Sequence, residues 1–297
     1  MRIAQCTPCV VSRLYLPIHR YNVTEILTTY DPITLAEMKG IRLMNRTDTK
    51  FVTTVGQLEK LLAMAGDMYY AQDIFGKRMA PYYTVYYDTP EWDMYNVHHT
   101  GRANRQKLRI RSYVDSGHNF LEIKTKNNHK RTKKRRVLVE GFDPSQPRYD
   151  LIFDSCRPKG EAVCTDFMKQ YLGYDPQMLH EQLENRFDRI TLVNKQKTER
   201  LTIDTNLRFH NLTTGSDASF DGIAIIELKR DGLAYSPILE MLRRLRIKPL
   251  GFSKYCMGSA LTNERLRVNR FLPRLRAIDK LRAVDCGAAP LLDRLNY

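Results

Sequence analysis

The sequence contains no apolar run approaching the ~18 residues that a membrane-spanning helix requires. Its N-terminal stretch also lacks a clean signal-peptide core, because Pro8, Arg13 and Pro17 interrupt the apolar residues. The six cysteines are scattered, and without a secretion signal we expect reduced thiols in the cytoplasm. Cys6 and Cys9 form a CxxC, which is a weak zinc or redox signal because no second pair accompanies it. These absences argue against a membrane-spanning or a disulfide-stabilised secreted protein.

Acidic residues are few relative to basic ones. Lys and Arg number 48 against 33 Asp and Glu, which gives a formal net charge of +15 over 297 residues. Such a surplus indicates an anionic partner: nucleic acid, an acidic membrane surface or a phosphate-rich small molecule. The hydrophobic content of 42% is that of an ordinary globular protein. With no repeat and no linker, we predict one α+β domain dominated by antiparallel strands.

Several segments alternate with a period of two, which predicts strands with one aliphatic and one charged face. In "KLRIRSY", Leu108 and Ile110 oppose Arg109 and Arg111. The segments "NRTDTK", "FLEIKTK", "RTKKRR", "RLTID" and "IIELK" repeat this pattern. Their charged faces carry Arg46, Asp48 and Lys50; Glu122, Lys124 and Lys126; Thr132, Lys134 and Arg136; Arg200, Thr202 and Asp204; and Glu227 and Lys229.

Two architectures could hold these charged faces. In an open sheet with one solvated side the charges would serve only solubility. In a closed barrel the aliphatic faces would meet helices outside and the charged faces would line a lumen. Cations facing one another across a cavity cost several kcal/mol per uncompensated ion. A polyphosphate with bound Mg²⁺ or Mn²⁺ would remove that cost, so the mainly basic faces favour closure.

The order of short motifs along the chain resembles that of a known family. The motifs are "YDPITLAEM", "NRTDTKFV", "YYDTPEW", "NRQKLRIRSYV", "FLEIKTK", "RTKKR", "NRFDRITLV", "RLTIDTNL", "IIELK" and "GFSKYC", from about Tyr30 to about Asn263. They resemble the triphosphate tunnel metalloenzymes, and most closely the polyphosphate polymerase domain of the vacuolar transporter chaperone. The resemblance implies an eight-stranded antiparallel β-tunnel with a charged lumen and helices packed outside.

The resemblance also implies a set of site residues. Catalytic roles would fall to Lys50, Arg109, Arg111, Glu227 and Lys254. Glu227 would bind Mn²⁺ or Mg²⁺, with Glu122 as a second ligand. Phosphate-binding cations would be Arg46, Lys50, Arg109, Arg111, Lys124, Arg186, Arg200, Lys229 and Lys254, and strand alternation adds Lys126, Lys134 and Arg136.

One departure from the wider superfamily is informative. Its first strand often reads ExExK, whereas this chain has Arg-Thr-Asp-Thr-Lys at 46–50. This favours the polymerase branch over adenylate cyclase or thiamine-triphosphatase relatives. We expect a lead-in at 1–30, the tunnel domain at 31–264 and a basic helical tail at 265–297, with no inositol-phosphate sensor and no transmembrane segment.

The expected activity is transfer of the ATP γ-phosphoryl group to phosphate or to a growing polyphosphate chain, with no nucleic-acid partner. A tunnel-type triphosphatase or polyphosphatase is an alternative, in which Asp204 or Glu122 would position a water molecule. A non-catalytic polyanion or nucleic-acid binder is a third possibility. The basic tail is most simply a solvated helix face, although it could guide a product chain.

Overall fold

The computed structural model describes residues 22–39, 46–129, 131–145, 160–232, 235–285 and 290–292. The helices are α1 (Val23–Thr28), α2 (Leu35–Lys39), α3 (Val55–Ala65), α4 (Asp93–His99), α5 (Gly160–Tyr171), α6 (Pro237–Arg244), α7 (Lys254–Thr262) and α8 (Leu272–Asp285). The strands are β1 (Asp31–Ile33), β2 (Arg46–Thr54), β3 (Tyr69–Gln72), β4 (Met79–Asp88), β5 (Arg105–Tyr113), β6 (His118–Lys126), β7 (Thr132–Leu138), β8 (His180–Asn194), β9 (Glu199–Asn211), β10 (Asp217–Ser219) and β11 (Ile223–Asp231). The Cys6–Cys9 pair and most of the predicted lead-in lie outside the described residues.

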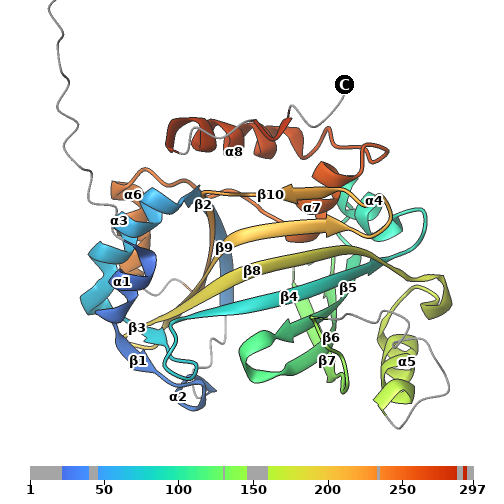
Figure 1. Cartoon of the computed structure of the whole chain (residues 1–297), viewed down its shortest axis with the longest axis horizontal. Coiled ribbons are helices and arrows are strands. Elements are labelled where there is room, and N and C mark those ends of the chain that lie inside the picture. The colour runs from blue at the N-terminus through green and yellow to red at the C-terminus, as the bar shows by residue number, and fades with distance from the viewer. Residues whose placement is uncertain are drawn as a thin grey trace, which may run out of the picture.

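The strands form one curled sheet, which confirms the predicted α+β class (Figure 1). Its main path has eight strands in the order β2-β11-β9-β8-β4-β5-β6-β7, and every neighbouring pair on it is antiparallel. The short strands β1, β3 and β10 attach beside this path. Within the described ranges no ladder joins β2 to β7, so the sheet is an open half-barrel and the predicted closed barrel is not confirmed.

Helices cover the convex face of the sheet because the aliphatic side chains of the strands point that way. On one half, α1, α3 and α6 pack against Phe51, Ile190, Leu201 and Ile226. On the other half, α5 packs against aliphatic residues of β5 and β6. Thr54 caps the start of α3, since its hydroxyl accepts a hydrogen bond of 3.2 Å from the Gln57 amide.

Part of the concave face is apolar, and here a helix lies inside the curl. Tyr82, Tyr86 and Phe187 from this face join α7 and α8 in one core cluster. Helix α7 approaches so closely that a Cβ at Gly258 would collide with Phe209 and Leu183. The expectation that all helices pack outside is therefore wrong for α7, which covers one portion of the concave face and leaves the charged portion beside it.

The start of α4 is fixed by two side chains that precede it. The Thr89 hydroxyl accepts a hydrogen bond of 3.1 Å from the amide of Asp93, where α4 begins. The Asp88 carboxylate accepts hydrogen bonds from the amides of Met94 and Tyr95, at 2.8 and 2.9 Å. None of the helices in the described ranges is both long and apolar enough to cross a bilayer.

Candidate active site

The charged side chains of the curled sheet share its concave face. Strand β5 alternates so that Leu108 and Ile110 are buried against the convex-side helix, which turns Arg109 and Arg111 inward. The antiparallel register then places Glu122 of β6 directly opposite Arg109. Cross-strand neighbours on one face have Cβ atoms ~5 Å apart, so this register brings opposite charges into contact.

The first ion cluster forms around Glu122, which is 1% exposed. The guanidinium of Arg109 donates to one carboxylate oxygen at 2.6 and 2.9 Å, and the ammonium of Lys134 donates to the other at 2.8 Å. Burial alone would raise the pKa of Glu122, but Arg109, Arg111 and Lys134 together lower it well below its usual range. Glu122 is therefore ionised at neutral pH, and both of its oxygens already have partners.

The second ion cluster forms around Asp204 on β9. Arg189 of β8 donates to both carboxylate oxygens, at 2.6 and 2.8 Å. Lys254, the first residue of α7, donates to the same carboxylate. Burial lowers the pKa of Lys254 to about 7; Asp204 opposes this shift, and Arg189 and Lys50 add to it. The helix inside the curl thus contributes a cation to the sheet's charged face.

The third ion cluster joins the edge strand β2 to its neighbour β11. The Glu227 carboxylate lies 3.0 Å from the Lys229 ammonium, and Lys50 is its cross-strand partner. Burial would raise the pKa of Glu227, but Lys229, Lys50 and Lys124 lower it well below its usual range. The Lys50 ammonium also donates to the Phe252 carbonyl at 2.8 Å, which ties β2 to the segment before α7.

Curling of the sheet brings these clusters to one space. Lys124 lies on β6 and Lys50 on β2, which would be about 29 Å apart across a flat sheet of this strand order. Charges that far apart are screened in water, yet Lys50 and Glu227 both influence Lys124. The pKa of Lys124 is lowered to about 7 by the surrounding protein atoms and by the cations Lys50 and Arg109, while Glu227 acts in the opposite direction. The side chain of Lys124 nevertheless remains exposed to solvent. An accessible group surrounded by protein atoms is what a concave site produces.

Arg111 is a further buried cation, and it forms no ion pair with the carboxylates of the three clusters. It is 7% exposed, and its guanidinium lies 5.8 and 5.9 Å from the rings of Tyr82 and Phe187. Its Nε has no hydrogen-bond partner within the described part of the chain. Burial and the nearby Arg109 lower the pKa of Arg111. We call the three ion clusters with Arg111 and Lys124 the inner site, in which cations outnumber the carboxylates Glu122, Asp204 and Glu227.

Several predicted phosphate-binding residues lie at the margins of the inner site. Lys126 is half-buried on the same face of β6, and Arg136 is exposed with its guanidinium 4.4 Å from the Phe120 ring. Arg200 is half-buried and donates to the Met38 carbonyl at 3.2 Å. The side chain of Arg46 lies outside the described residues.

Arg186 is the predicted site residue that the structure places elsewhere. It lies on the convex face, with its guanidinium 4.3 Å from the Tyr83 ring and a hydrogen bond of 3.1 Å to the Pro144 carbonyl. The inward arginine of β8 is Arg189, which sequence reasoning missed. The alternation along β8 distinguishes the two arginines. Ile190 pairs with Ile203 in the core on the convex side, so every second residue from Ile190, including Arg186, faces the convex side.

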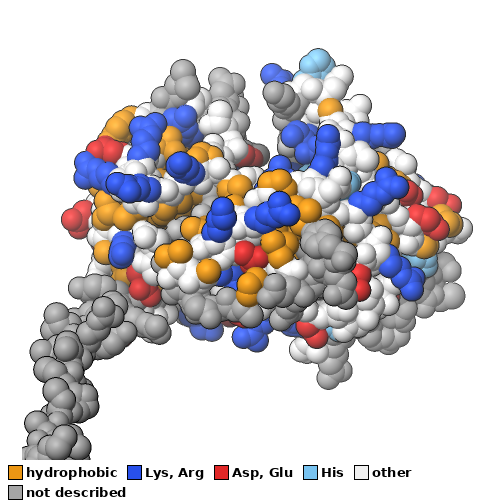
Figure 2. Space-filling model, turned by 90° about the horizontal axis from the view of Figure 1, so that it is seen from above, with side chains coloured by type: hydrophobic (Ala, Val, Ile, Leu, Met, Phe, Trp, Pro, Cys, Tyr) orange, Lys and Arg blue, Asp and Glu red, His pale blue; other side chains and the backbone are white. Residues whose placement is uncertain are grey.

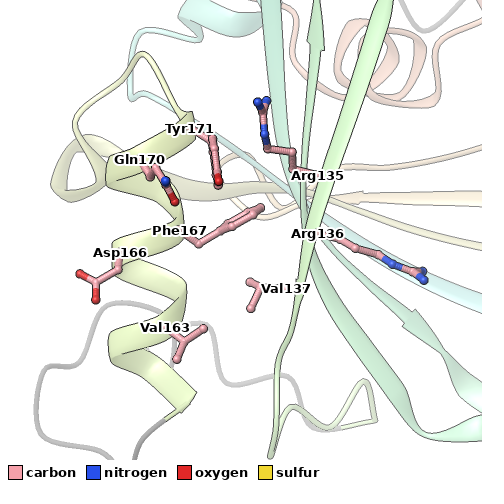
Figure 3. A pocket seen from close by; sticks show the side chains of 8 residues that line it. All are labelled: Arg135, Arg136, Val137, Val163, Asp166, Phe167, Gln170 and Tyr171. Atoms are coloured by element: carbon pink, nitrogen blue, oxygen red, sulfur yellow. The ribbon is translucent and has the colours of Figure 1, made fainter.

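A cavity of about 620 Å³ lies between α5 and β7, away from the three ion clusters. Figure 3 shows that Arg135 points toward α5, where its guanidinium lies 4.2 Å from the Tyr171 ring, whereas Arg136 points to the opposite side of β7. The cavity therefore belongs to the convex side of the sheet, and the charged chemistry belongs to the concave side.

A divalent cation fits the inner site only with help from a substrate. The described residues contain no cluster of three His, Cys, Asp or Glu side chains that could enclose a metal. Mg²⁺ typically takes one or two carboxylates together with phosphate oxygens and water. Glu227 is ionised and 20% exposed, so it suits that role. Glu122 suits that role less well because its oxygens bind Arg109 and Lys134, and its role as a second metal ligand stays a prediction.

Comparison with known structures finds loose likenesses. A putative adenylyl cyclase from Hippeastrum, described as having a dominant triphosphatase activity, is 15% identical with a TM-score of 0.44, over 73% of this chain and 96% of that one. PH1819 from Pyrococcus horikoshii is 12% identical with a TM-score of 0.39, over 73% and 98%. A conserved hypothetical protein from Pyrococcus furiosus is 15% identical with a TM-score of 0.35, over 69% and 92%.

Comparison with curated protein sequences finds no match. The family model of the VTC domain, in contrast, matches residues 45–263, which is well over half of the chain. The match spans β2 to α7 and so includes every residue of the inner site. The chain therefore belongs to the VTC domain family.

Proposed function

We propose that this protein is a metal-dependent polyphosphate polymerase that transfers the γ-phosphoryl group of ATP to phosphate or to a growing polyphosphate chain. The observation that supports this most is the surplus of half-buried cations on one concave face. Each carboxylate of the inner site is already paired with a cation, so the remaining positive charge there requires an anion from outside the chain. A chain of phosphates has the charge density and the length to supply it.

The chemistry demands little from protein side chains beyond position and charge. Phosphoryl transfer proceeds through a loose transition state whose charge is spread over phosphate oxygens. Arg109, Arg111 and Lys50 would hold those oxygens, and Arg189 and Lys254 would do so from the neighbouring strand and helix. A phosphate acceptor is already ionised, so neither a side-chain nucleophile nor a general base is needed.

Glu227 would hold the divalent cation together with substrate oxygens. A bound Mg²⁺ or Mn²⁺ supplies neutralisation of phosphate charge and a fixed geometry for the phosphate oxygens. Lys229, 3.0 Å from Glu227, would keep that carboxylate ionised and oriented.

The arrangement of the other carboxylates favours transfer to phosphate over hydrolysis. A hydrolase needs a group that positions water, and Asp204 and Glu122 were the candidates. Asp204 is bound by Arg189 and Lys254, and Glu122 by Arg109 and Lys134, so cations already contact both oxygens of each carboxylate.

The proposal is tested by incubating the full chain with ATP and Mn²⁺ and separating the products on a polyacrylamide gel. We expect a ladder of long chains, abolished by Glu227→Gln and retained by Glu240→Gln, a matched change on the exposed surface of α6. Free phosphate alone would indicate a hydrolase, and full activity in Glu227→Gln would contradict the metal assignment.

A further inference from the structure

A second group of cations surrounds His98 at the C-terminal end of α4. Arg105 and Lys107 of β5, Lys126 of β6 and Arg274 of α8 all act on this imidazole. Burial and these four cations lower the pKa of His98 to about 2, so the ring is neutral and adds no positive charge. We call Arg105, Lys107, Lys126 and Arg274 the outer cluster.

The outer cluster continues the inner site along the same two strands. Residues 105, 107, 109 and 111 share the concave face of β5, and the register pairs Lys107 with Lys124 and Arg105 with Lys126. Arg105 and Arg111 are six positions apart along the strand, a distance of about 20 Å. Lys107 also acts on Lys124, which links the two groups of cations electrostatically.

Fixed contacts hold the outer cluster in place. Lys107 donates to the Ser253 hydroxyl at 2.6 Å and lies 5.2 Å from the Tyr255 ring. Arg105 donates to the Arg102 carbonyl at 2.7 Å. The guanidinium of Arg274 lies beside Gly251, where an added Cβ would be 3.7 Å from its Nε. Strand, helix and loop thus converge on one set of half-buried cations.

Three of the four cations of the outer cluster lack an acidic partner among the described residues. Arg105, Lys107 and Arg274 form no ion pair with any carboxylate in the part of the chain that the structure describes. Half-buried cations that repel one another without a counter-charge are stabilised when an anion joins them.

We propose that the outer cluster is a second phosphate-binding subsite, which holds units of a polyphosphate chain beyond those held by the inner site. This rests on the proposed function and extends it, because about 20 Å of cationic strand exceeds what a triphosphate can contact. Arg274 comes from α8, beyond the residues that match the VTC domain. Single-stranded nucleic acid fits less well, because the adjacent rings of Tyr255 and Phe271 are buried and offer no face for base stacking.

The test measures binding of two probes, sodium tripolyphosphate and a long-chain polyphosphate, to the full chain by calorimetry. The double variant Arg105→Gln/Arg274→Gln should bind the long chain about tenfold more weakly and with a reduced salt dependence. Its affinity for tripolyphosphate should stay unchanged. Arg276→Gln is the matched control, since this arginine is exposed on the same helix, two residues from Arg274.

The outcomes separate this proposal from the proposed function. Equal losses for both probes, or a double variant that binds the long chain like Arg276→Gln, would overturn the outer subsite even if the protein polymerises phosphate. Selective loss of long-chain binding would support the subsite even if no product ladder forms. An oligonucleotide that binds as tightly as polyphosphate, and loses affinity in the double variant, would reassign the cluster to nucleic acid.

Discussion

Replacing Asp204 by Asn tests how the charged face is held together. The substitution keeps the shape of the side chain and removes its charge. Asp204 is 4% exposed and is the shared partner of Arg189 and Lys254, which are themselves 14% and 11% exposed. Both cations would then remain in a buried position without a counter-ion.

Removing one partner of a buried ion pair costs about 3–5 kcal/mol. The cost depends on pH because Lys254 can release its proton. Its pKa is about 7 with Asp204 present, and Asp204 raises it, so the variant's Lys254 should titrate below 7. In the unfolded chain the same lysine stays protonated to about pH 10. Just below pH 7, Lys254 is protonated in the folded wild type but still neutral in the folded variant. The stability gap should therefore widen as pH falls, by at most about 1.4 kcal/mol per pH unit.

Urea denaturation followed by circular dichroism, at pH values above and below 7, measures both effects. Adding Lys254→Met to Asp204→Asn removes the buried ammonium, and this double variant should recover part of the stability and lose the widening gap. A cost below about 1 kcal/mol, the range of exposed ion pairs, would refute the buried cluster. So would a gap that stays constant as pH falls.

Three further perturbations probe the inner site. Arg189→Gln should weaken tripolyphosphate binding about tenfold or more, whereas Arg186→Gln on the convex face should leave it unchanged; calorimetry compares them, and equal losses would contradict the placement of either residue. Affinity for tripolyphosphate should fall as pH rises through about 7, because Lys124 and Lys254 lose their protons there; changing both to Arg should flatten the profile, and an unchanged fall would assign it to other groups. Glu122→Gln should lower the free energy of unfolding by about 3 kcal/mol, because two cations lose their partner; urea denaturation measures this, and lost activity with unchanged stability would instead support Glu122 as a metal ligand.

Period-two alternation was enough to predict the charged face, because it depends only on neighbouring residues of one strand. Strand β5 shows such a pattern, because Leu108 and Ile110 alternate with Arg109 and Arg111. In the structure the two aliphatic side chains lie in the core and the two arginines face the other side, as predicted. The same reasoning applied to β8 would have selected Arg189. Arg186 was chosen from the family resemblance without testing which face its position occupies.

Features set by distant parts of the chain could not be predicted in this way. Whether β2 meets β7 depends on the curvature accumulated over eight strands, which no short segment encodes. The position of α7 inside the curl depends on Gly258 fitting against Phe209, a contact between residues far apart in the sequence. Glu122 could not be separated from Glu227 as a metal ligand, because the number of cations around each carboxylate follows from strand register.

The free edge of the half-barrel has a consequence for solubility. Among the described residues β7 ends the sheet, and four consecutive residues in it, from Lys133 to Arg136, are basic. An unpaired strand edge invites hydrogen bonding with another molecule's edge, and the usual protection is a row of like charges. Two copies of β7 brought side by side would juxtapose these rows. Figure 2 shows that Lys and Arg side chains are also spread over the face of the molecule seen from above. The protein can therefore leave its barrel unclosed and still resist association through that seam.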